Sequence, residues 1–187
     1  MKFRTFLVGA LIAALLQTGA LAKIIYDRAE LLQNGQEVVL ETGFVDPRDL
    51  FRGHYVTLNL IVSRLETKTL SRIDDFSYSD TIYLELEQGE GLFAKAKAIT
   101  TSYPENASGP VIKGTARTTH SKSSPKKSLN FNFPFDRYFA PELRAKELEK
   151  LRSDRKLGVI LVLDGKGNGA IKGITIDGEK VYEEPLL

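Results

Sequence analysis

The stretch Thr81-Ile-Tyr-Leu-Glu-Leu-Glu87 alternates apolar and polar side chains along the chain. Its three aliphatic side chains fall on one face, whereas Tyr83, Glu85 and Glu87 fall on the other. This is the pattern of a β-strand that is buried on one side and faces water on the other. We therefore expect a sheet here, with both glutamates on its solvated face.

Similar segments lie on both sides of this strand. Gly89-Glu-Gly91 predicts a hairpin turn, and Asp177-Gly178 predicts another near the end of the chain. A helix is expected over Ala140–Leu151, because Pro141 stands in the first turn, where proline is tolerated. The other strand candidates are 37–40, 55–60, 92–100, 111–117, 128–133, 157–163, 170–176 and 180–182.

These segments predict a mainly β (α+β) fold. We expect an antiparallel β barrel or sandwich of about eight to nine strands with one helix. An N-terminal hydrophobic helix precedes it. Residues 35–187 are enough to bury a core as one domain, so we expect a single exported β-rich domain there.

The N-terminal segment is apolar. Lys2 and Arg4 precede an uncharged, mostly apolar run over residues 5–22. A short basic region before such a run directs insertion into a membrane with the N-terminus inside. We expect residues 1–22 to be a signal peptide or membrane anchor, with a helix that can reach residue 32, and the domain to lie on the periplasmic side of a bacterial inner membrane.

Two fates of this segment stay open. Ala20-Leu-Ala22 fits the small-x-small pattern of cleavage sites, and cleavage at Ala22 would release a domain that begins at Lys23. Ile24 and Ile25 extend the apolar run past Lys23, which makes it long enough to remain in the membrane as an anchor.

The charge balance disfavours nucleic acid as a partner. The chain has 26 basic side chains, of which Lys2 and Arg4 lie in the N-terminal segment, and the other 24 match its 24 acidic side chains. A neutral domain does not have the basic footprint that nucleic-acid binding needs. The basic stretch 118–127 contains no aromatic side chain for base stacking, and we expect it to be an exposed loop.

The residue types also disfavour metal chemistry. The chain has no cysteine, and its two histidines, His54 and His120, have no partner at ligand spacing. Asp164-Gly-Lys-Gly-Asn-Gly169 is superficially similar to a calcium loop, but Lys166 stands where an oxygen ligand belongs. Its glycines fit a hairpin turn with positive φ. We expect neither a metal nor another cofactor.

The densest local pattern is Val45-Asp-Pro-Arg-Asp-Leu-Phe-Arg-Gly-His-Tyr-Val-Thr-Leu-Asn-Leu60. Pro47 and Gly53 interrupt it, as in a tight excursion between strands. Four charged side chains of this stretch can hold the turn through Asp–backbone and Arg–Asp hydrogen bonds. We expect this network to consist of Asp46, Arg48, Asp49 and Arg52.

The same stretch resembles the signature of the GDYXXLXY family, whose name spells that motif. Two further blocks resemble the family: Phe135-Asp-Arg-Tyr-Phe-Ala-Pro-Glu142, before the expected helix, and the closing strands over 169–178. Tyr55 and residues 137–139 are expected to present an aromatic surface. The candidate functional residues in these blocks are Asp46, Pro47, Arg48, Asp49, Arg52, Gly53, Tyr55, Arg137, Tyr138, Phe139 and Glu142.

The chain departs from the family pattern at a few positions. His54 stands where the motif has aspartate, Leu60 where it has its last tyrosine, and Leu143 and Ala145 where glycines are usual. A catalytic role of the motif aspartate would therefore be missing here, and no catalytic residue is predicted.

The resemblance implies a location and a partner. Members of this family are bacterial and membrane-anchored, and some are encoded beside or fused to multi-spanning membrane proteins. We therefore expect a non-enzymatic, membrane-anchored periplasmic domain that binds an integral membrane protein. Two alternatives stay open: an envelope hydrolase that uses the carboxylates of Asp46, Asp49 and Glu142, and a small-ligand carrier that uses a barrel interior.

Overall fold

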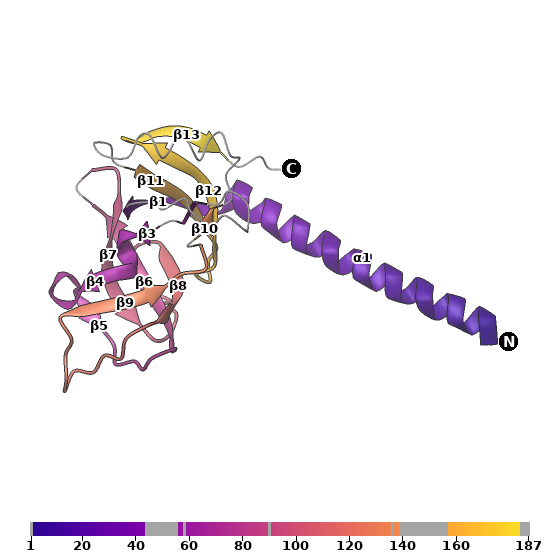
Figure 1. Cartoon of the computed structure of the whole chain (residues 1–187), viewed down its shortest axis with the longest axis horizontal. Coiled ribbons are helices and arrows are strands. Elements are labelled where there is room, and N and C mark those ends of the chain that lie inside the picture. The colour runs from indigo at the N-terminus through magenta and orange to yellow at the C-terminus, as the bar shows by residue number, and fades with distance from the viewer. Residues whose placement is uncertain are drawn as a thin grey trace.

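The computed structural model describes residues 2–43, 56–57, 59–89, 91–135, 137–138 and 157–183. Within these residues one long helix, α1 (Lys2–Asn34), precedes strands that form two main sheets. Figure 1 shows the helix projecting away from the β domain, with the N-terminus at its far end. The predicted mainly β fold with an apolar N-terminal helix is confirmed. The helix expected over residues 140–151 lies outside the described residues.

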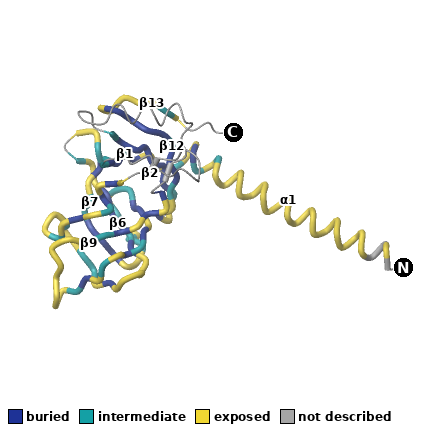
Figure 2. Tube along the Cα trace, viewed as in Figure 1, coloured by how far each residue is buried: buried dark blue, intermediate teal, exposed yellow. Residues whose placement is uncertain are grey.

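α1 is one continuous helix that joins the apolar segment to the first strand. Its 33 residues correspond to about 50 Å at the usual rise of an α-helix. The part from Phe6 to Asn34 is long and apolar enough to cross a membrane, and its apolar stretch is exposed throughout (Figure 2). A surface of this kind is stable when lipid or another protein covers it.

The last turn of α1 attaches the helix to the sheet. Leu32 is 3% exposed and packs against Val162 and Ala170. The Gly35 amide donates to the Leu31 carbonyl at 2.8 Å, which closes the helix just before the first strand. The helix therefore passes into the β domain without a linker.

The first sheet has five strands in the order β13-β12-β11-β1-β3, and every pair in it is antiparallel. Its last three strands along the chain form an antiparallel meander, which confirms the strands expected over 157–163, 170–176 and 180–182. The bounds are β1 (Gln36–Gly43), β3 (Asn59–Leu60), β11 (Leu157–Leu163), β12 (Gly169–Ile176) and β13 (Glu179–Glu183).

The second sheet has six strands in the order β4-β9-β8-β6-β7-β5. Its pairs are antiparallel apart from β5 and β7, which run parallel. The bounds are β4 (Arg64–Glu66), β5 (Arg72–Ile73), β6 (Thr81–Gln88), β7 (Ala94–Thr100), β8 (Val111–Ala116) and β9 (Ser128–Asn132).

The described residues contain more strand segments than the sequence predicts, because residues 59–73 form short strands separated by turns. Two 3₁₀ turns, Ile61–Ser63 and Thr67–Thr69, separate strands of two or three residues. The predicted strand over 55–60 is described in two parts. β2 (Val56–Thr57) pairs with β10 (Arg137–Tyr138), whereas β3 pairs with β1.

Both sheets contribute to one hydrophobic core. Leu40 and Leu161 from the first sheet and Ile82 and Ile112 from the second are each 0% exposed and belong to the same cluster. The apolar side chains along β9 and just beyond it, Leu129, Phe131, Phe133 and Phe135, are all buried. The rings of Phe133 and Phe135 stack with their centroids 5.9 Å apart.

Candidate functional site

Most of the candidate residues predicted from the sequence lie outside the described residues. These are Asp46, Pro47, Arg48, Asp49, Arg52, Gly53, Tyr55, Phe139 and Glu142. Arg137 and Tyr138 are described as strand β10, without their side chains. The turn network and the aromatic surface therefore stay predictions.

The short ladder between β2 and β10 nevertheless joins two of the motif blocks. Arg137 is paired with Thr57, and Tyr138 with Val56, in antiparallel register. These pairs join the strand that begins directly after Tyr55 to the block that begins at Phe135. Two blocks about 80 residues apart in sequence are thus neighbours, and antiparallel partners lie about 5 Å apart.

Phe135 secures the beginning of the second block inside the protein. The side chain is 4% exposed. Its ring lies 3.3 Å from the place that a Cβ on Gly169 would occupy, at the start of β12. Ala170, the next residue, packs against Leu32 of α1. The second motif block therefore starts close to the base of the helix.

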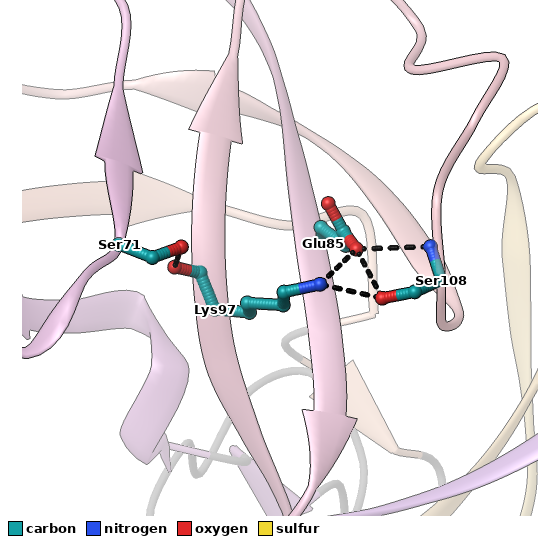
Figure 3. A network of polar contacts seen from close by, with 4 residues as sticks. All are labelled: Ser71, Glu85, Lys97 and Ser108. Atoms are coloured by element: carbon teal, nitrogen blue, oxygen red, sulfur yellow. Dashed lines mark hydrogen bonds and ion pairs between the residues drawn. The ribbon is translucent and has the colours of Figure 1, made fainter.

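A polar cluster that the sequence does not indicate lies on the second sheet (Figure 3). Lys97 Nζ donates to Glu85 Oε1 at 3.0 Å and to Ser108 Oγ at 2.5 Å. Ser108 donates to the same carboxylate oxygen from its backbone amide at 3.0 Å and from its hydroxyl at 2.9 Å. On the other side of β7, Ser71 Oγ donates to the Lys97 carbonyl at 2.9 Å. The cluster thus ties four segments of the chain together: the residue before β5, the strands β6 and β7, and the loop between β7 and β8.

The expectation that Glu85 faces water is wrong. The residue is 9% exposed, because the segment around Ser108 covers it. The pairing of β6 with β7 shifts register at this place: Glu85 is opposite Ala98 and the next residue, Leu86, is opposite Ala96, so Lys97 is the extra residue of a β-bulge. A bulge redirects a side chain, and here the ammonium meets the carboxylate.

The environment of Glu85 keeps it ionised. Burial by itself raises the pKa of this carboxyl, but the hydrogen bonds from Lys97 and Ser108 outweigh burial, and the pKa is lower than its ordinary value. Hydrogen bonds that are made to the charged form of a carboxyl stabilise that form.

The Glu85–Lys97–Ser108 cluster has a structural role. Ser108 also lines a groove of about 570 Å³, beside Glu87 and Leu92. A serine beside a lysine becomes a nucleophile when the amine is free to accept the hydroxyl proton. Here the amine is engaged in an ion pair with Glu85, so the arrangement holds the segment around Ser108 in place.

The prediction that the basic stretch over 118–127 is an exposed loop is only partly correct. Residues 122–127 are exposed, but His120 is 5% exposed. Its ring lies 5.7 Å from that of Phe76, and the backbones of the two residues form an antiparallel bridge. The apolar packing of the ring against Phe76 explains its burial.

The loop 164–169 is a hairpin turn in which Asp164 binds the backbone. Its carboxylate accepts hydrogen bonds from the amides of Lys166 and Asn168, each at 2.8 Å. Gly167 adopts φ +87°, as the predicted turn requires. In the described part of the chain, no three His, Cys, Asp or Glu residues gather as metal ligands.

A groove of about 920 Å³ lies where α1 meets the β domain. One wall is the last part of the helix, from Lys23 to Asn34. The other wall consists of Tyr103 and Gly109 on one loop and residues 163–166 at the β11–β12 turn. Charged side chains of both signs line it: Lys23, Asp27, Arg28, Glu30, Asp164 and Lys166.

These features define a class of protein: a β domain carried directly on an apolar helix of membrane-spanning length. Comparison with family models then identifies the family. The model of the GDYXXLXY protein family matches residues 17–174, and the chain belongs to this family. The match includes the second half of α1, the motif blocks over 45–60 and 135–142, and most of β12. No match was found among curated proteins or among solved structures.

Proposed function

We propose that this chain is a non-enzymatic, membrane-anchored domain on the periplasmic side of a bacterial inner membrane, where it binds an integral membrane protein. The observation that carries the proposal is α1. Its apolar surface is exposed, and the same helix continues to Leu32, which is packed into the β domain. An anchor that is continuous with the domain holds that domain against the membrane surface.

The position of the motif blocks supports a partner in the same membrane. The β2–β10 ladder brings two blocks together, and Phe135 connects the second block to strand β12, on which the helix base rests. A surface near the base of an anchor is within reach of the extramembrane loops of another membrane protein. The motif is therefore proposed as the contact surface.

The test is a reciprocal purification. The full chain with a C-terminal tag is extracted from native membranes in mild detergent, and each protein recovered with it is then tagged and purified in turn. We expect one integral membrane protein to be recovered in both directions. Repeated recovery of the chain alone would contradict the proposal.

Two variants and one control locate the contact. Replacing residues 5–22 by an unrelated apolar span should preserve the complex if the β domain makes the contact. Asp49→Ala should weaken the complex, while the control Lys126→Ala, on an exposed loop, should not.

A C-terminal reporter enzyme that is active only outside the cytoplasm tests on which side of the membrane the domain lies. An inactive fusion at normal abundance would overturn the periplasmic assignment.

A further inference from the structure

The groove at the base of α1 lies at a defined depth if the helix spans a membrane. The segment from Phe6 to Tyr26 is about 31 Å long at the rise of an α-helix, which matches the hydrocarbon core of a bilayer. Tyr26 then stands at the boundary, where tyrosine is favoured. Lys23 extends towards water and binds Asp27 with a nitrogen–oxygen distance of 2.7 Å.

The helical wall of the groove therefore crosses the headgroup layer. The layer is about 5–8 Å thick on each side of the bilayer, or roughly four or five helical residues. Three charged residues that follow Tyr26 lie at this depth: Asp27, Arg28 and Glu30. All three are exposed and line the groove. Phospholipid headgroups are the molecules that occupy this layer.

The charges of the two walls complement a headgroup that carries both signs. Two of the acidic side chains are already engaged, Asp27 by Lys23 and Asp164 by the amides of its own loop. Lys166, at the tip of the β11–β12 turn, presents an exposed ammonium on one wall, and Glu30 presents an exposed carboxylate on the other. A purely anionic ligand would be attracted by the first and repelled by the second.

We infer that this groove binds the headgroup of a zwitterionic aminophospholipid. Lys166 contacts the phosphate, and Glu30 accepts hydrogen bonds from the primary ammonium. The inference rests on the membrane anchoring in the proposed function but not on the protein partner. It assigns a ligand class to a surface outside the motif blocks, and it makes the lipid a second attachment that restrains the domain about its anchor.

The experiment uses the full chain in nanodiscs made of phosphatidylcholine with equal additions of phosphatidylethanolamine and phosphatidylglycerol. After gentle release, native mass spectrometry counts the lipids that stay bound to the protein. We expect phosphatidylethanolamine to be retained over both others, because phosphatidylcholine has no ammonium proton to donate and phosphatidylglycerol has no ammonium at all.

Two variants separate the roles of the walls. Lys166→Gln should reduce retention of phosphatidylethanolamine about fivefold, the effect of one interfacial cation. Glu30→Gln should remove its preference over phosphatidylglycerol. Lys126→Gln and Glu179→Gln, both at exposed positions, are the matched controls and should change neither. Unchanged thermal unfolding of each variant confirms that the fold is intact.

Different failures identify different errors. Equal retention of the three lipids, a preference for phosphatidylglycerol, or variants that behave like the wild type would overturn the inference and leave the anchoring intact. A photoreactive residue at position 166 that crosslinks to a protein instead of lipid would show that a partner occupies the groove. Failure of the chain to enter nanodiscs would overturn both the anchoring and the lipid site.

Discussion

Glu85 is a carboxylate that stays charged although the protein almost covers it. Its side chain is 12% exposed and that of Lys97 is 31% exposed. An ion pair at this depth contributes to stability when further hydrogen bonds satisfy both groups, and Ser108 supplies them. Removing Lys97 would leave the largely buried Glu85 carboxylate without its charged partner.

The stability of the protein should therefore depend on the protonation of Glu85. Because its pKa is lower in the folded than in the unfolded state, the stabilisation is present above the ordinary pKa and is lost as the pH falls through the folded value. We expect the melting temperature of the wild type to fall more steeply than that of Glu85→Gln between about pH 6 and pH 3. Thermal unfolding followed by circular dichroism measures this.

Glu87→Gln is the control for this comparison, because Glu87 is exposed on the same strand. Its pH profile should follow that of the wild type. Parallel profiles for the wild type and Glu85→Gln would show that the ion pair does not stabilise the fold.

The segment between β7 and β8 illustrates how one element depends on another. It runs so close to β6 that a Cβ on Gly109 would lie 2.0 Å from the Leu86 carbonyl oxygen. The Leu86 amide donates to the Pro110 carbonyl at 2.8 Å. The close approach places Ser108 over Glu85, so the cluster depends on a glycine at position 109.

Gly109→Ala should destabilise the domain. The added methyl group cannot be placed without moving backbone, and overpacking of this kind costs about 1–3 kcal/mol. The displaced segment should also release Ser108 from Glu85. Chemical denaturation gives the free energy of unfolding, and amide exchange at Ser108 reports the local effect.

Gly165→Ala is the matched control, because a Cβ at that glycine meets nothing within 4 Å. It should change the free energy of unfolding by less than about 0.5 kcal/mol. Equal effects at the two positions would contradict the argument from close approach.

At the scale of the whole molecule, α1 and the β domain are coupled. The helix passes through Ala22, the predicted cleavage position, and continues to Asn34, and Leu32 packs into the second, smaller apolar cluster with Val162 and Ala170. Cleavage at Ala22 would cut α1 within a continuous helix. We predict a retained anchor on the ground that α1 is continuous through Ala22.

We expect the mature protein to keep residues 1–22. Its intact mass, measured after detergent extraction, should include this segment, and the protein should stay with membranes after a high-pH wash. A mature chain that begins at Lys23 would show that the segment is a cleaved signal peptide. Leu32→Asp should leave residues 1–22 in the mature chain but loosen the helix from the sheet, which amide exchange over residues 27–35 would detect.

The sequence by itself determined the elements whose burial follows a simple period. The apolar run of α1, the alternation in Thr81–Glu87 and the closing meander depend on neighbours along the chain, so local pattern and turn chemistry are enough to predict them. The family signature was likewise visible in the order of residues, although the structure does not describe most of it.

Tertiary structure alone decided which polar groups meet. The bulge at Lys97 arises from the pairing of two strands, the burial of Glu85 from a loop that crosses it, and the β2–β10 ladder from a contact between distant segments. The groove at the base of α1 exists because the end of the helix and two loops lie next to one another. Such features depend on distances between residues far apart in sequence, which periodicity does not contain.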